Sequence, residues 1–293
     1  MAPIRTQWTR LIRFVANETA RVHIGQPVDP ALDVGLAAHQ GKVIKAYEIT
    51  GSVLDPTAQV TKKVLTVKSL LTPLSGEQVK VVRCLGLNYS DHAAEANLPK
   101  PAFPILFYKP ITALIGPLAP IVIPKVAQPP KEHLPDYEVE LVIVIGKAAK
   151  NVSEADALDY VSFRKHQMAV SQWNFSKGFD NTNPFGPCLV SSSLIGDPQQ
   201  IPLKCTVNGK VLQDGNTAEQ IFNVRQTVSF LSQGTTLQPG SIILTGTPKG
   251  VGFVRKPPVY LQGGDKINVW LGSGIGSLFN DVQEEKDTPL SKL

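Results

Sequence analysis

The segment 137–146 constrains the fold of this chain more than any other, because it is almost entirely apolar and yet carries two carboxylates. Val142 to Ile145 show no alternation of polar and apolar residues, which is typical of a strand buried on both faces. In a strand, residues i and i+2 point to the same face, about 6.5 to 7 Å apart, so Glu138 and Glu140 should aim at one spot.

A pair of buried carboxylates needs a compensating charge. Two bare anions so placed repel each other and resist burial, whereas a shared divalent cation holds both of them ionised. The alternative is a solvent-facing strand edge, on which the two glutamates merely alternate with valine and leucine. The unbroken apolar run that follows favours burial, and we therefore interpret Glu138 and Glu140 as half of a hard-metal site.

Composition limits the class of protein. A length of 293 residues, 42% of them hydrophobic, is enough for one sizeable core, or for one small and one larger domain. The net charge of +5 comes from scattered lysines and arginines, so no nucleic-acid partner is expected. No apolar stretch reaches membrane-spanning length, so no membrane association is expected. The three cysteines indicate buried thiols in a reducing compartment.

The N-terminal residues bear on location. They are rich in arginine and contain no acidic residue before Glu18, which faintly resembles a mitochondrial presequence. Residues 10–15 and 21–24 are, however, typical of two strands joined by a polar turn, so this end of the chain is expected to be folded. We predict a cytoplasmic protein, with a mitochondrial location as the alternative.

Strand and turn signals divide the chain in two. Short β-like runs at 42–47 and 63–71 predict a small β-rich N-terminal domain over residues 1–76, which ends where proline and glycine break the pattern. A larger domain over residues 77–293 is predicted to follow, and it begins with a buried strand at 79–87.

Helices are expected to be few. The 24 prolines and 23 glycines are spread through the chain, as in a β-rich fold with many turns. Capping and periodicity signals predict helices at 90–97, 153–161 and 219–232. The predicted fold class is α+β, and mainly β.

His92 and Glu95 are spaced i and i+3 on the first of these helices, so their side chains should lie within reach of each other. A carboxylate beside an imidazole raises its basicity and fixes its tautomer, which a general base needs to take a proton from water. The pair alone is weak evidence, because this spacing is common on exposed helix faces.

Five motifs along the chain, in order, occupy residues 84–95, 107–110, 136–141, 177–180 and 244–252. Together they resemble the fumarylacetoacetate hydrolase family over almost the whole chain. The resemblance implies that family's mixed β-sandwich roll and a homodimer. It also implies a Mg²⁺ or Mn²⁺ site, and chemistry on small β-diketo or 2-oxo acids, either hydrolytic C–C cleavage or decarboxylation.

The resemblance further implies roles for single residues. A divalent ion on Glu138 and Glu140 would chelate a 2-oxo acid and stabilise a departing enolate. His92, oriented by Glu95, would activate the attacking water, and Lys177 would stabilise developing negative charge. The alternative for Lys177 is an ordinary surface lysine.

Four residues are expected to bind substrate: Lys109, Arg164, Gln167 and Thr247. The glycines around Thr247 would let backbone N–H groups approach an anion, although this loop could be only a tight turn. Lys109 could equally be a lysine that snorkels from a strand end. Loop shape at 97–103 and 181–187 is expected to set the choice of substrate.

One departure from the family concerns its third metal ligand, an aspartate on a strand before Arg164. Tyr160 stands in its place, so a stretch about one strand long is missing. Two carboxylates bind a hard cation more weakly than three, unless Asp159 or substrate oxygens substitute. A gene model that skips an in-frame piece, a weakened enzyme and a catalytically silent relative remain as explanations.

We therefore predict a metal-dependent hydrolase or lyase that cleaves an acylpyruvate-like β-diketo acid, or decarboxylates a 2-oxo acid such as oxaloacetate. The alternatives are a silent homodimer of the same fold, and an accessory hydrolase or isomerase of secondary metabolism.

Overall fold

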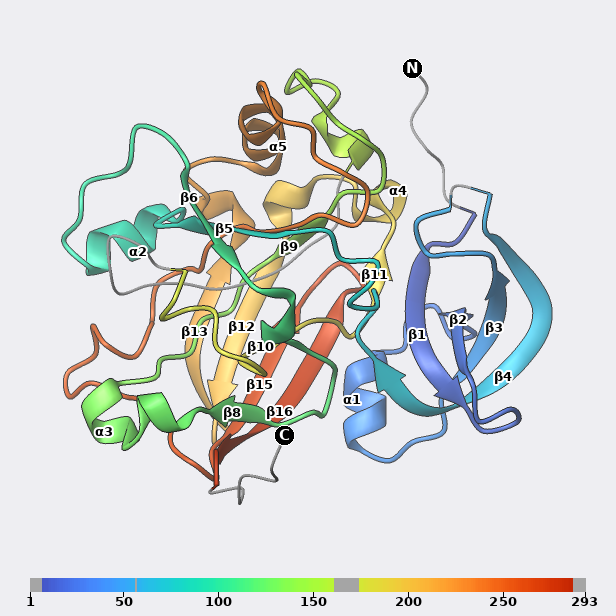
Figure 1. Ribbon diagram of the computed structural model, residues 1–293, viewed down its shortest axis with the longest axis horizontal. Helices are drawn as coiled ribbons and strands as arrows, with labels where there is room; N and C mark the ends of the chain where they lie inside the picture. The colour runs from blue at the N-terminus through green and yellow to red at the C-terminus, as the bar shows by residue number, and fades with distance from the viewer. Residues whose placement is uncertain (1–6, 56, 161–173, 287–293) are drawn as a thin grey trace, which may run out of the picture.

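The structure is a computed structural model that describes residues 7–55, 57–160 and 174–286 (Figure 1). Strands dominate it and helices are short, which confirms the predicted α+β, mainly β class. Within these ranges, no helix combines the length and the apolar composition that crossing a membrane requires.

The N-terminal strands form a closed sheet, grouped at one side of the molecule in Figure 1. They are β1 (Arg10–Ala16), β2 (Val22–Pro27), β3 (Lys45–Thr50) and β4 (Gln59–Leu71). Each pairs antiparallel with the next, and β1 also pairs with β4. The short β11 (Leu189–Val190) extends this sheet beside β1, so a segment from the second half of the chain joins the N-terminal strands.

A four-stranded mixed sheet in the order β6-β5-β14-β9 supports the predicted site residues. Its members are β5 (Val82–Gly86), β6 (Ile105–Lys109), β9 (Val142–Val144) and β14 (Ile242–Leu244). The pairing of β14 with β5 is parallel, and the other two pairings are antiparallel.

A second large sheet has the order β13-β12-β15-β16-β8. It contains β8 (Ile121–Ile123), β12 (Pro202–Val207), β13 (Lys210–Asn216), β15 (Lys266–Leu271) and β16 (Gly276–Glu284). A small parallel pair joins β7 (Leu114–Ile115) to β10 (Asn183–Pro184).

The α-helices lie between strands and are α1 (Val34–His39), α2 (Ser90–Glu95), α3 (Pro130–His133), α4 (Ser192–Ile195) and α5 (Val224–Ser232). The helix predicted at 90–97 is confirmed as α2. The helix predicted at 219–232 begins later, because Asn223 caps α5 and forms a capping box with Gln226.

The helix predicted at 153–161 is wrong for its described part. Residues 153–156 form a turn, in which the Ser153 hydroxyl donates to Asp156 over 2.6 Å. Only a short 3-10 helix follows, at Ala157–Tyr160. Residue 161 lies outside the described ranges.

The strand β9 has a buried edge that no other described strand covers. Residues 141, 143 and 145 turn their backbone groups toward β14, so those of Val142 and Val144 face the other way. Both residues are buried, with exposures of 0% and 4%. Buried backbone groups are normally paired, and none of the described strands supplies partners for this edge.

Candidate active site

Glu138 and Glu140 precede β9 and are buried, with 5% and 0% exposure. The strand expected over 137–146 is hydrogen-bonded as a ladder only at Val142–Val144, and the carboxylates lie on the segment that leads into it. Both carboxylates face the same cations, because each of them raises the pKa of Lys109 and of Lys177 against the effect of burial.

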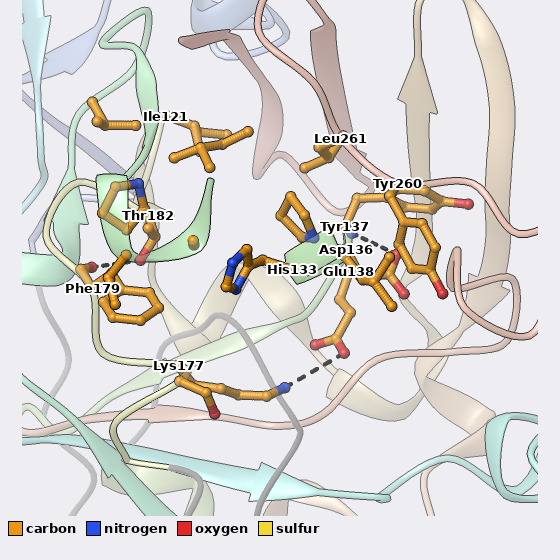
Figure 2. Close-up of a pocket in the computed structure, with 18 of the residues that line it drawn as sticks. Ile121, His133, Asp136, Tyr137, Glu138, Lys177, Phe179, Thr182, Tyr260 and Leu261 are labelled. Atoms are coloured by element: carbon orange, nitrogen blue, oxygen red, sulfur yellow. Dashed lines mark hydrogen bonds and ion pairs between the residues drawn. The ribbon is translucent and has the colours of Figure 1, made fainter. Parts of the chain in front are cut away.

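Lys177 points toward Glu138, with 3.6 Å between its Nζ and Oε1 of the carboxylate (Figure 2). It is 4% exposed, and burial lowers its pKa to about 7, with a further lowering from the charge of Lys109. This setting excludes the alternative of an ordinary surface lysine. Lys109 is also buried, and its Nζ donates to Oδ1 of Asn183 over 2.7 Å, which excludes the snorkelling alternative.

His92 and Glu95 meet as their spacing predicts, with 2.7 Å between Nδ1 and Oε1. His92 is 1% exposed, and its Nε2 has no hydrogen-bond partner among the described residues. The start of α2 is fixed by Asn88, whose amide donates to the carbonyl groups of Thr245 and Phe222. His92 thus has a buried imidazole whose Nδ1 contacts Glu95, while its Nε2 has no partner among the described residues.

The loop after β14 ties these groups together. The N–H of Gly246 donates to Oε2 of Glu140, and the N–H of Gly250 donates to Oε2 of Glu95 over 2.8 Å. Glycine is needed at 246, where φ is +88° and a Cβ would lie 2.9 Å from that of Asn88. The N–H groups of these glycines therefore bind anions, as expected, but the anions are the side-chain carboxylates of Glu140 and Glu95.

Thr247 is buried, and its hydroxyl is engaged on both sides. It donates to the carbonyl of Val139 over 2.8 Å and accepts from Nε2 of Gln213 over 2.8 Å. Gln213 also accepts from the N–H of Val139, so both side chains brace the segment that carries the two glutamates. Substrate contact by Thr247 stays a prediction, and its hydroxyl is already used.

A cavity of about 630 Å³ opens beside Glu138 and Lys177 (Figure 2). Lys109, Ser176 and Asp136 also line it. Its other walls are mainly apolar, and they include Ile121, Val122, Val126, Leu134, Phe175, Phe179, Phe253 and Leu261. Among the described residues, its lining contains neither His92, Glu95, Glu140 nor Thr247.

Asp136 links the glutamate segment to the cavity wall. Its carboxylate accepts the N–H groups of Gly252 over 2.7 Å and Phe253 over 2.9 Å. Burial, and then the charge of Glu138, raise the pKa of Asp136 to about 6, while these hydrogen bonds oppose the rise.

The cavity walls only partly match the loops expected to choose the substrate. Thr182 from the 181–187 loop lines the cavity, but no residue of 97–103 does so. The segments 121–127 and 133–138 supply most of the wall instead. Sequence reasoning missed them because apolar residues that line a cavity and those that fill a core share one pattern.

The structure does not describe the side chains of three expected site residues. Arg164 and Gln167 lie outside the described residues, and so does the side chain of Asp159. Within the described part of the chain, no group of three or more His, Cys, Asp and Glu side chains could hold a metal ion. Glu138 and Glu140 offer the oxygen donors that a hard cation prefers, but they fall one carboxylate short of the expected set.

Comparisons with known proteins agree on one family. The family model described as fumarylacetoacetate (FAA) hydrolase C-terminal matches residues 81–283. A caffeoylpyruvate hydrolase of Neonothopanus nambi is 61% identical over 297 residues, which cover 98% of this chain and 97% of that protein. Because this alignment is longer than the 293-residue chain, the relative carries residues that this chain lacks.

More distant relatives cover nearly the same length. The mitochondrial oxaloacetate tautomerase FAHD2A of Homo sapiens is 40% identical over 93% of this chain and 91% of its own. The crystal structure of 2-hydroxyhepta-2,4-diene-1,7-dioate isomerase from Mycobacterium marinum matches with a TM-score of 0.74 and 31% identity, and covers 95% of this chain and 100% of that one. The chain therefore belongs to the fumarylacetoacetate hydrolase family and is one of its enzymes.

Proposed function

We propose that this enzyme is a metal-assisted hydrolase that cleaves the C–C bond of an acylpyruvate, a β-diketo acid, to release pyruvate and a carboxylic acid. The observation that carries the proposal is that buried Glu138, Lys109 and Lys177 line a large, mainly apolar cavity, with Glu140 buried two residues from Glu138. The printed names of two relatives, a caffeoylpyruvate hydrolase and an oxaloacetate tautomerase, support an oxo acid as substrate.

The size of the cavity favours an acylpyruvate over oxaloacetate. Oxaloacetate has four carbons and two charged ends, and it would leave most of a 630 Å³ cavity unfilled. Apolar walls stabilise apolar groups, because burial removes such groups from water. An acylpyruvate joins a large apolar acyl group to a small charged oxo-acid end. The acyl group matches the apolar walls of the cavity, and the charged end matches its lysines. Decarboxylation or tautomerisation of oxaloacetate is the weaker candidate.

The divalent ion, Mg²⁺ or Mn²⁺, would be held by Glu138 and Glu140 and would polarise the keto oxygen of the substrate. Lys177 and Lys109 add positive charge near the position where negative charge develops. His92 accepts a proton from water at Nε2, and Glu95 fixes the tautomer through Nδ1. The apolar walls keep the remaining water away from the reacting atoms.

Metal binding is expected to be weak in this chain. The strand that would carry a third carboxylate is proposed to be missing, and its loss is supported by the outer edge of β9, with which none of the described strands pairs. Lys177 also competes with the ion for Glu138, because its ammonium already lies 3.6 Å from that carboxylate. A catalytically silent protein of the same fold is therefore the second candidate.

The other sequence-based expectations remain parts of this proposal. They comprise a homodimer, a small-molecule oxo or β-diketo acid as partner, no nucleic acid or membrane partner, and a cytoplasmic location. The mitochondrial alternative gains support from the printed name of the human relative. The division into domains at 1–76 and 77–293 is retained with the addition of β11 to the first sheet.

The test is pyruvate release from a series of acylpyruvates with acyl groups of increasing size, and from oxaloacetate as the decarboxylation control. Turnover should require Mg²⁺ or Mn²⁺, stop with EDTA, and fall at least about 100-fold in Glu138→Gln. The matched control is Glu132→Gln, because Glu132 is an exposed glutamate on the nearby α3. Turnover that ignores both EDTA and Glu138→Gln would reject this mechanism, and no turnover of any acylpyruvate would favour the silent protein.

A further inference from the structure

Lys109 is a buried cation that one neutral side chain holds in place. It is the last residue of β6, it is 7% exposed, and it donates to Asn183 over 2.7 Å. Burial lowers the pKa of Lys109, which reflects the cost of keeping an ammonium group out of water. A buried charge of this kind is usually retained for a function.

Asn183 is fixed by its backbone and has an unused donor. It pairs with Leu114 in the small parallel sheet, and two residues earlier the N–H of Asn181 donates to Thr112. Its side chain is 1% exposed. Oδ1 accepts from Lys109, but Nδ2 has no hydrogen-bond partner among the described residues. A buried amide normally satisfies both ends, so an acceptor is missing.

Two donors in the cavity lining also lack a hydrogen-bond partner among the residues that the structure describes. The Ser176 hydroxyl and the Lys177 ammonium are buried and have no hydrogen-bond partner within the described part of the chain, although Lys177 forms the ion pair with Glu138. Both residues line the cavity, as does Lys109. Asn183 does not itself line the cavity but contacts Lys109 in its wall, so three donors without a hydrogen-bond partner among the described residues lie on or next to this wall, and such a group suits an anion.

We propose that Asn183 and Ser176, with Lys109, form the binding site for the substrate's carboxylate. In this site Asn183 acts twice, since Oδ1 positions the Lys109 ammonium and Nδ2 donates to a carboxylate oxygen. Ser176 donates its hydroxyl, and Lys109 supplies the charge. The inference rests on the proposed function, because it takes an oxo acid as the ligand.

Thr247, which is the other described residue expected to bind substrate, has no free side-chain donor. The hydroxyl of Thr247 donates to the carbonyl of Val139, so it cannot also donate to a substrate. A carboxylate offers about four acceptor positions, which an amide, a hydroxyl and an ammonium group can fill together. A neutral amide in the same place offers fewer acceptor positions than a carboxylate. Its own N–H groups would also face the three donors and could not bind them.

The test compares the binding of pyruvate with that of pyruvamide, its uncharged counterpart, by isothermal titration calorimetry. The wild-type protein should prefer pyruvate. Ser176→Ala and Asn183→Asp should each weaken pyruvate binding about tenfold or more and leave pyruvamide nearly unchanged. The control is Ser192→Ala, because Ser192 is an exposed serine at the start of α4.

Asn183→Asp separates the two roles of Asn183. An aspartate would hold the Lys109 ammonium at least as firmly, but it would lack the N–H donor and would repel a carboxylate. Unchanged pyruvate affinity in both variants would overturn the proposal, and so would an equal loss for pyruvate and pyruvamide. Since the readout is binding of a product, failure to turn over acylpyruvates would reject the proposed function without deciding this one.

Discussion

At the scale of single residues, Glu95 joins two parts of the site, because its Oε1 lies beside Nδ1 of His92 and its Oε2 accepts the N–H of Gly250. The spacing of His92 and Glu95 predicts their contact, and the structure places it at 2.7 Å. The second bond of Glu95, from the N–H of Gly250, joins residues far apart in the sequence. No local pattern encodes such a contact, because it depends on how β14 and β5 pair.

Glu95 offers a test of the proposed base. Glu95→Gln keeps the size of the side chain but leaves one acceptor for the two donors, His92 and Gly250. We expect kcat for acylpyruvate cleavage to fall about 100-fold with little change in KM, because general-base assistance acts in the transition state. The measurement is steady-state pyruvate release. A rise in KM with unchanged kcat would assign Glu95 to binding.

At the scale of elements, the edge of β9 that no described strand pairs with makes a prediction about hydrogen exchange. Ile143 donates its N–H toward β14, whereas Val142 and Val144 direct theirs away from β14. All three are buried. Hydrogen exchange followed by NMR should find the amide of Ile143 protected by several orders of magnitude more than those of its two neighbours. Equal protection would show that another segment covers this edge.

The loop after β14 makes a second prediction at this scale. A Cβ at Gly252 would lie 1.8 Å from the carbonyl oxygen of Val259 and 2.5 Å from Oδ1 of Asp136. Gly252→Ala should therefore lower the free energy of unfolding by about 2 kcal/mol or more. Gly146→Ala is the matched control, since its Cβ would have no neighbour within 4 Å. Chemical denaturation measures both variants, and equal stability would contradict this packing.

Apolar patterns located fewer than half of the strands in the described part of the chain, and the helices were less predictable still. Alternating or continuous apolar runs located β1, β2, β5 and β9 within a few residues. The predicted helix at 219–232 was too long because Asn223 interrupts it with a cap. Periodicity alone could not place the cavity, because its walls come from separate segments that only the tertiary fold brings together.

At the scale of the whole molecule, the N-terminal strands and the larger part of the chain share their packing. Leu11 on β1 pairs with Leu189 on β11, and Asp33 accepts hydrogen bonds from both the N–H and the hydroxyl of Ser277 on β16. Leu11 also lies in a hydrophobic cluster with Val142 and Leu244. The two proposed domains are therefore expected to unfold together.

Urea denaturation followed by far-UV circular dichroism and tryptophan fluorescence tests this coupling. Wild-type protein should show one coincident transition with both probes. Leu11→Ala, which leaves a cavity at a fully buried position, should lower the free energy of unfolding by about 2–5 kcal/mol and keep the two curves coincident. Two separated transitions would mean that residues 1–76 fold as an independent unit.

The central claim is that Glu138 and Glu140 together hold a divalent ion. Isothermal titration of Mn²⁺ into the wild-type protein and into a double variant with Glu138→Gln and Glu140→Gln tests it without any assumption about the substrate. We predict saturable binding to the wild type, with a Kd on the order of 10⁻⁴ to 10⁻³ M because the site has only two carboxylates, and its loss in the double variant. Absence of saturable binding to the wild type, or equal binding to both proteins, would contradict the claim.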